Sequence, residues 1–487
     1  MDISVQVVRQ TKRHTKAELE ELSKERLIER IIQLESQNFQ LKNIIQKVTG
    51  SKSNESGKSD SKKQRKFDFS KCHKRHILLR FYYLGWDYQG YASQEDSACT
   101  IEHHLFNALT RVCLIESRET SNYHRCGRTD KGVSAFHQVV SLDVRSKLAP
   151  ERQLDPEALA EELDYCQLLN RVLPQDIRCV AWMPMVNPNY SARFDCKART
   201  YRYFFPRGNL NAKAMSEACS YLVGSHDFRN LCKMDVGNGV VTFRRNIHYA
   251  FVRESLQDGA DSSYDMLYFE LRGKAFLWHQ VRCIMAILIL IGQGKEDPTV
   301  IKELLDVEKN PRKPQYSLAN DIPLNLYECQ FRNKGTFDPV LFDKNGPVPD
   351  FDDDDGMESE LREWVHEEES LSRTISELQG LWASNMIKSS MCREMLRSLE
   401  ETFAQKFADK SKILSQHSIL LQGVQSKEYQ PLMDRQKCES LESRIEHYAK
   451  KRRIQVSIKE NSGDDDANKN ELAKEPNSSS NSGSTSE

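Results

Sequence analysis

The chain has 487 residues, 38% of them hydrophobic and 29% charged, and its formal net charge at pH 7 is −1. This length allows two or more structural units with a full hydrophobic core. The near-neutral total by itself predicts no nucleic-acid partner, but the charge is uneven, because an acidic C-terminal region offsets mildly basic N-terminal and central regions.

Thirteen cysteines are scattered along the chain, and no two of them have Cys-x-x-Cys spacing. Because the N-terminus is charged and lacks an apolar signal core, this pattern indicates a reducing compartment. We therefore expect the protein in the nucleus, the cytoplasm or both. The long apolar run from Cys283 to Gly292 is too short to span a bilayer, so we expect a core helix and no membrane contact.

Residues 1–48 are predicted to be helical, with a heptad pattern between residues 16 and 48. One set of residues spaced by seven is Leu27, Leu34, Leu41 and Val48, and the other is Ile31, Asn38 and Ile45. The pattern fits either a short parallel coiled-coil dimer, with Asn38 fixing its register, or a single amphipathic helix that packs on its own protein. Residues 49–74 are rich in Ser, Lys and Asn and predict a flexible basic linker.

Short β-rich segments alternate with helical ones in the central region, residues 75–335. The expected strands lie around 77–83, 137–144, 177–182, 201–205, 249–252 and 266–271, and the expected helices near 101–112, 156–171, 211–222 and 274–292. This mixture favours an α+β fold with a largely antiparallel sheet and flanking helices.

Beyond the central region, residues 336–458 predict a charged helical extension, and residues 459–487 a disordered tail rich in Ser, Asn and Glu. The acidic run from Asp350 to Asp355 lacks the spacing of a calcium loop, so it indicates a solvated linker.

A loop motif combines one carboxylate with two glycines and two cations, in the order Gly127-Arg128-Thr129-Asp130-Lys131-Gly132, just before a strand-like segment. Glycines allow a sharp turn and a close approach to a ligand. Arg128 and Lys131 would favour the ionised form of Asp130 and could also bind phosphate oxygens. The combination suits an aspartate that acts as nucleophile or base on an anionic, nucleotide-like substrate.

This motif resembles the catalytic motif of the TruA-type pseudouridine synthases. Four further stretches resemble family motifs in the same order, namely 77–91, 197–205, 222–228 and 273–282, with 100–102 between the first two. The resemblance covers about residues 75–330 and implies the family's two-lobed fold, with its active cleft between the lobes. The N-terminal segment and the stretch around residues 429–446 resemble the eukaryotic branch that modifies uridines 38 and 39 in the anticodon stem-loop of tRNA.

The resemblance implies roles for five residues. Asp130 would be the essential catalytic residue, whether it attacks the sugar, attacks the ring or acts through its charge. Tyr201 would be the second catalytic residue, which stacks on the target uracil and is a candidate for the proton transfer, although Tyr201, Tyr203 and Phe205 also fit one face of a core strand. Arg282 begins a buried helix and needs a carboxylate partner, either Asp130 or another acid. Arg128 and Lys131 would bind substrate.

Further expectations concern cofactors, partners and rival functions. Isomerisation of uridine oxidises nothing and adds no group, so we expect no cofactor and no metal. The partners would be tRNA and a second copy of the chain. Arg199, Arg202, Arg244 and Arg245 are candidate contacts to the RNA backbone. The alternative function is a catalytically idle protein that binds or remodels tRNA, and the retention of Asp130, Tyr201 and Arg282 together argues against it.

Overall fold

The computed structural model describes residues 67–94, 97–236, 239–240, 242–254, 263–331, 362–407, 416–417, 419–423 and 428–452. The chain divides into two units, residues 1–67 and 68–487, and apart from Phe67 the described residues belong to the second. The predicted heptads, the aspartate run, the C-terminal tail and residues 49–66 of the predicted basic linker lie outside the described residues. Residues 67–74 of that linker are described and contain a 3-10 turn at Phe69–Lys71 and the first residues of the strand that begins at His73. The proposed division of the chain into segments therefore stays a prediction.

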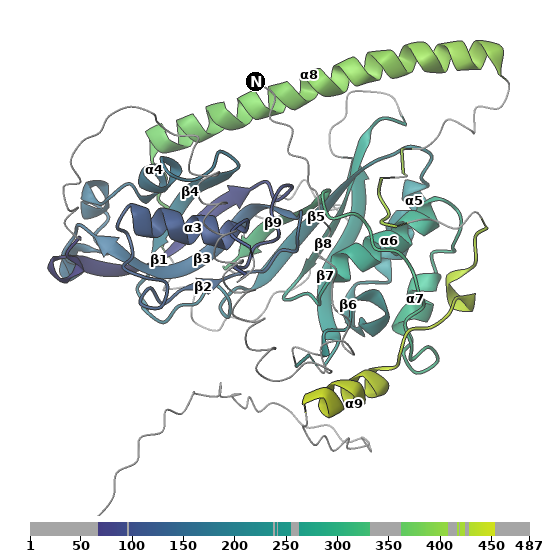
Figure 1. Ribbon diagram of the computed structural model, residues 1–487, viewed down its shortest axis with the longest axis horizontal. Coiled ribbons are helices and arrows are strands. Elements are labelled where there is room, and N and C mark those ends of the chain that lie inside the picture. Colours follow the sequence, from purple (N-terminus) through teal and green to yellow (C-terminus); the bar gives the residue numbers. More distant parts are fainter. Residues whose placement is uncertain are drawn as a thin grey trace, which may run out of the picture. The chain divides into compact units, whose positions relative to one another are not determined.

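Nine strands of the described region form one sheet (Figure 1). They are β1 (His73–Tyr83), β2 (His124–Arg125), β3 (Ser134–Ser146), β4 (Ile177–Pro184), β5 (Ala198–Pro206), β6 (Gly224–Asp227), β7 (Arg244–Glu254), β8 (Met266–Gly273) and β9 (Leu324–Gln330). Their order is β4-β1-β3-β9-β5-β8-β7-β6, with β2 paired to β3. The expected mixed α and β structure with a mostly antiparallel sheet is confirmed. All six expected strands lie within observed ones.

The junction between β3 and β9 determines where the site can form. It is the one parallel pairing in the described sheet and spans only Ser134 with Asn325 and Ala135 with Leu326. All other ladders are antiparallel. The sequence analysis missed β9, although this strand joins the two halves of the sheet. The loop that carries Asp130 ends where β3 begins, and it therefore lies at this junction.

Two hydrophobic cores lie on the two sides of this junction. One contains buried residues of β1, β3, β4 and the helices α3 (Ile101–Arg111) and α4 (Tyr165–Asn170). The other contains buried residues of β5, β7, β8 and the helices α5 (Ala212–Ser220), α6 (Gln280–Gly292) and α7 (Val300–Leu305). Tyr201 of β5 packs against both cores. A side chain at this position is thus held from both sides.

Two helix predictions need correction. The expected helix over 274–292 begins only at Gln280, because His279 adopts a left-handed backbone conformation with φ of +58°. The expected helix over 156–171 is broken into a 3-10 turn at Ala158–Glu161 and α4, whose first turn is capped by Asp164. An aspartate at this position accepts a hydrogen bond from a free N–H group of the next turn and starts a new helix.

Two α-helices of the described region follow the sheet in the sequence, α8 (Glu368–Lys406) and α9 (Leu441–Arg452). The start of α8 packs on β4, and Glu377 forms an ion pair with Arg178, with 2.6 Å between Oε2 and Nε. Among the described residues, no helix is both long and apolar enough to cross a membrane.

Candidate active site

The Asp130 loop joins β2 to β3 and is fixed by hydrogen bonds on both sides of Asp130. The Tyr91 N–H donates to the Thr129 carbonyl oxygen at 3.1 Å, and the Gly132 N–H donates to the Tyr88 carbonyl oxygen at 3.2 Å. Gly132 has φ of +78°, and a Cβ there would lie 3.0 Å from the Asp321 carboxyl carbon. A side chain at this position would therefore be strained and crowded, which explains the glycine.

Arg199 holds the start of the same loop. Its guanidinium donates to the Cys126 carbonyl oxygen from Nε at 3.1 Å and from Nη2 at 2.7 Å. It also donates to the carbonyl oxygens of Lys274 and Arg193. We expected Arg199 to contact the RNA backbone, but these bonds engage its donors within the protein. Arg202 likewise forms an ion pair with Glu270, with 2.5 Å between Nε and Oε2.

The Asp130 side chain lines a cavity of about 400 Å³, which we call the catalytic cavity. Its walls include Arg128, Tyr201, Phe276, Trp278, His279 and Arg282. The Asp130 side chain is 30% exposed and lines this cavity. The volume lies in the range that small-molecule sites occupy.

The electrostatics of Asp130 combine two opposing effects. Burial raises the pKa of its carboxyl above the ordinary value of 3.8. The positive charge of Arg282, a hydrogen bond from the Trp278 side chain and the Lys233 charge all act in the opposite direction. The net pKa is raised, so the carboxylate is less stable in the folded protein than in water, as in many catalytic carboxylates.

His279 lies against Asp130, with 3.4 Å between Nε2 and Oδ2. Burial, together with the charges of Arg282, Lys233 and Lys313, lowers the pKa of His279 to about 4. The imidazole is therefore neutral at physiological pH, and the contact is then no ion pair. Its left-handed backbone costs energy for a residue other than glycine, and such strain tends to cluster at functional sites.

Arg282 is the first charged residue of α6 and is only 4% exposed. Its Nε donates to the Ala319 carbonyl oxygen at 2.8 Å, and its Nη2 lies 3.7 Å from Oδ2 of Asp321. The sequence left open whether Arg282 pairs with Asp130 or with another acid. In the structure its ion pair within 4 Å is with another acid, Asp321. Arg282 still acts on Asp130 through its charge, which lowers the pKa of that carboxyl.

Tyr201 lies in the wall of the catalytic cavity, partly buried on β5. Its ring packs edge-on against Phe276, with 5.1 Å between ring centroids and an interplanar angle of 88°. Burial raises the pKa of the Tyr201 hydroxyl far above neutral, so the group keeps its proton. The arrangement supplies both an aromatic surface and a protonated hydroxyl at the cavity.

The two remaining predicted residues lie differently. Arg128 is exposed and lines the catalytic cavity, and burial together with the charges of Arg125 and Arg193 lowers the pKa of its guanidinium. Lys131 is also exposed but does not line this cavity. Its role in substrate binding stays a prediction.

Sequence reasoning left Trp278 and His279 out of the site and did not single out Lys233 or Asp321. The first two belong to the stretch 273–282 that resembles a family motif, so the signal was present. Because the sequence pattern predicts one continuous helix over 274–292, Trp278 and His279 are interpreted from it as packing residues of a core helix. Among the described residues, no group of three or more His, Cys, Asp or Glu side chains is arranged to hold a metal ion.

Comparison with known proteins gives a consistent result. A family model described as tRNA pseudouridine synthase matches residues 218–332. The human tRNA pseudouridine(38/39) synthase is 45% identical over 455 residues, which cover 88% of this chain and 89% of the human protein. The enzyme of that name from Saccharomyces cerevisiae is 44% identical over 331 residues, covering 66% and 73%. A probable tRNA pseudouridine synthase from Caenorhabditis elegans is 35% identical over 408 residues, covering 81% and 94%.

The sheet, the Asp130 cavity and these similarities define an isomerase that acts on nucleosides within RNA. The chain belongs to the TruA-type family of tRNA pseudouridine synthases.

Proposed function

We propose that this chain converts uridine to pseudouridine at positions 38 and 39 of the tRNA anticodon stem-loop, with Asp130 as its essential residue and without a cofactor. The observation that carries the proposal is the Asp130 carboxylate, which has a raised pKa and faces a cavity of about 400 Å³ beside Tyr201 and Arg282. The names of the human and yeast relatives support the two positions. The two cores that meet at Tyr201 support the two-lobed arrangement.

The reaction breaks the bond between the ribose and N1 of uracil and forms a bond between the ribose and C5. The C5 proton is lost and N1 gains a proton, so atoms and electrons balance without an oxidant or reductant. Asp130 supplies the carboxylate at the reacting centre, and Arg282 stabilises its charge. Tyr201 provides a wall that keeps the detached base in the cavity.

A uridine inside a stem must leave the base stack before its glycosidic bond can be reached. Arg128 is exposed at the cavity, where a guanidinium can bind phosphate oxygens and replace stacking interactions of the displaced nucleotide. We therefore assign Arg128 to holding the extruded nucleotide.

The first experiment maps pseudouridine at single-nucleotide resolution in anticodon stem-loop transcripts incubated with the protein alone. We expect conversion at positions 38 and 39, and in matched transcripts with cytidine at one position we expect conversion only at the other. Conversion confined to other positions would reject the proposed positions while retaining the enzyme class. An RNA that binds but shows no conversion would favour an idle RNA-binding protein.

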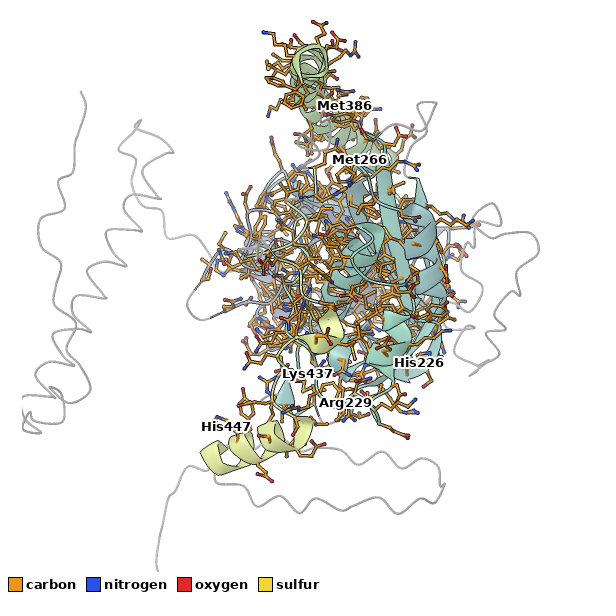
Figure 2. All side chains as sticks on the ribbon, turned by 90° about the vertical axis from the view of Figure 1, so that its right-hand side faces the viewer. His226, Arg229, Met266, Met386, Lys437 and His447 are labelled. Carbon is orange, nitrogen blue, oxygen red and sulfur yellow. The ribbon has the colours of Figure 1, made fainter. Side chains whose placement is uncertain are left out.

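We also propose a homodimer, and α8 supports it. This 39-residue helix has only two buried residues, Ser370 and Thr374. Figure 2 shows its side chains projecting on all sides, with Met386 among them. Large exposed apolar side chains lie along two faces of this helix. One face carries Ile375, Leu378, Trp382, Met386 and Leu396, and the opposite face carries Ile387, Met391, Met395 and Leu399. Trp382 is 62% exposed, and a second copy of the same helix is the partner that would cover the face around it.

Light scattering after size exclusion tests the dimer. We expect the wild type to have twice the 56.4 kDa mass of one chain. Substitution of Trp382→Lys should shift it towards one chain, because a charge would be buried in the interface. Ser390 is exposed and polar and lies outside both apolar faces, so Ser390→Lys is the matched control. A monomeric wild type would contradict the proposal.

The thirteen cysteines are all free in the structure, and most are buried. Small buried thiols without disulfides fit a reducing environment. On this ground we propose that the enzyme acts in the nucleus, the cytoplasm or both.

A further inference from the structure

A second cavity adjoins the catalytic cavity and has a volume of about 350 Å³. We call it the basic cavity. Its wall carries the cationic side chains of Arg125, Arg128, Arg193, Lys233 and Arg245. One carboxylate, Asp235, lines it. These cations come from several separate segments, so the sequence shows no basic run at this place.

The positive charge of the basic cavity is only partly balanced by the protein. Arg125 pairs with the buried Glu102, with 2.5 Å between Nη1 and Oε1, but Glu102 also pairs with Arg118 at 3.1 Å. The charges of Arg125 and Arg193 help to lower the pKa of Arg128, so these cations repel one another. A bound anion would relieve this repulsion.

Arg245 also lies in the wall of the basic cavity. Its Nη1 donates to the carbonyl oxygens of Arg244 at 2.6 Å and Thr242 at 3.3 Å, while its Nε is buried without a hydrogen-bond partner among the described residues. A buried donor without a partner is costly. Because the Arg245 side chain lines the basic cavity and guanidinium donors match phosphate oxygens in geometry, an oxygen-rich anion is the ligand that it would bind there.

The two cavities share a wall, made of Arg128, Asp235, Phe276, Leu277 and Trp278. Trp278 contributes an aromatic surface, and the Lys233 ammonium lies 4.2 Å from its ring centroid. A nucleotide in the catalytic cavity is joined through phosphates to its neighbours on the same strand. A ligand that occupies the basic cavity at the same time would therefore be the adjoining part of that strand.

We propose that the basic cavity binds the phosphodiester backbone next to the target uridine, through Arg193, Lys233 and Arg245, and thereby positions the strand for reaction at Asp130. This inference rests on the proposed function, since it needs RNA in the catalytic cavity. The basic cavity combines cationic side chains with an aromatic wall. This combination suits a single strand, because the cations can bind its phosphates and the aromatic ring can stack on a base.

The salt dependence of binding gives the first test. Affinity for an anticodon stem-loop RNA is measured by fluorescence anisotropy at several salt concentrations, with wild type, Arg193→Gln and Arg245→Gln. Each lost phosphate contact should reduce the slope of log affinity against log salt by about 0.7 for single-stranded RNA. Arg152 is an exposed arginine paired with Glu161 and lines neither cavity, so Arg152→Gln is the control and should leave the slope unchanged.

The second test locates the phosphate. Stem-loop RNAs carry one uncharged methylphosphonate, either beside the target uridine or in the lower stem. Arg193→Gln should weaken binding of the unmodified RNA about tenfold, the scale of one charge-assisted hydrogen bond. This loss should disappear on the RNA with the methylphosphonate beside the target and persist on the lower-stem RNA. Arg193 is exposed, so its substitution leaves the fold intact even if Arg245→Gln does not.

The outcomes separate this inference from the proposed function. Unchanged slopes for both variants, or a loss that no methylphosphonate position removes, would overturn the basic cavity as a phosphate site even if pseudouridine forms normally. If the wild type forms no pseudouridine but shows the expected slopes and coupling, the proposed function fails and the phosphate site stands.

Discussion

Replacement of Asp130 by asparagine is expected to abolish pseudouridine formation and, at neutral pH, to stabilise the fold. The rate should fall by at least about 10³-fold, the scale on which enzymes lose activity without their essential carboxylate or nucleophile. The amide keeps the size of the side chain but can neither carry the negative charge nor act as a base. Single-turnover conversion of an anticodon stem-loop RNA measures the loss.

The direction of the stability change follows from the raised pKa. Because burial raises the pKa of Asp130 in the folded state above 3.8, ionising this group is harder in the folded protein than in the unfolded chain. At a pH well below 3.8 the group is protonated in both states, and the wild type loses no stability relative to the variant through this group. As the pH rises, the unfolded state gains by ionising first, so the wild type becomes less stable relative to Asp130→Asn.

Thermal unfolding midpoints from about pH 4 to pH 7 test this direction, and the advantage of the variant should grow over that range. The control is Glu151→Gln, because Glu151 is an exposed acid of a surface turn and its substitution should change neither activity nor this pH trend. Retention of activity within tenfold would show that Asp130 is not essential. An advantage that shrinks with rising pH would contradict the burial argument.

The residue pattern alone predicted six of the nine strands in the described sheet and the Asp130 loop, but not β2, β6, β9 or the neighbours of Asp130. Alternating apolar residues predict a strand wherever it is packed, which is why 77–83 and 201–205 lie within observed strands. A strand such as β9 is short and half polar, so its pattern is weak. The resemblance supplied Tyr201 and Arg282, which are distant in sequence from Asp130 and line the same cavity.

The remaining features of the site depend on burial and backbone conformation, which cannot be predicted from the residue pattern. Histidine adopts the left-handed conformation more often than most residues other than glycine, but still uncommonly, so the sequence does not predict this conformation at His279. Arg199, Arg202 and Arg245 are alike in the sequence, and all three have partners within the protein, but of these three only Arg245 also lines the basic cavity. The choice of Asp321 rather than Asp130 as the close partner of Arg282 is likewise a matter of geometry.

Substitution of Arg282 by methionine should reduce both stability and activity, for reasons that can be separated. The change removes the hydrogen bond to Ala319 and leaves Asp321 without its cation, and breaking such a buried pair costs about 3–5 kcal/mol of the free energy of unfolding. It also removes the positive charge that lowers the pKa of Asp130. The acid limb of the pH–rate profile should therefore move to higher pH, and the rate should fall about 10²-fold or more.

The double variant Arg282→Met with Asp321→Asn separates the two effects, because it neutralises the acid that the single variant leaves unpaired. We expect part of the lost stability to return in urea unfolding, and the acid limb to move part of the way back, because the charge of Asp321 raises the pKa of Asp130. The rate at the pH optimum should stay as in the single variant. Arg282→Lys keeps a positive charge and should hold the acid limb closer to that of the wild type, which provides a folded comparison. If the double variant also recovers the rate, Arg282 acts through Asp321. If it does not, the field of Arg282 at Asp130 is what the reaction requires.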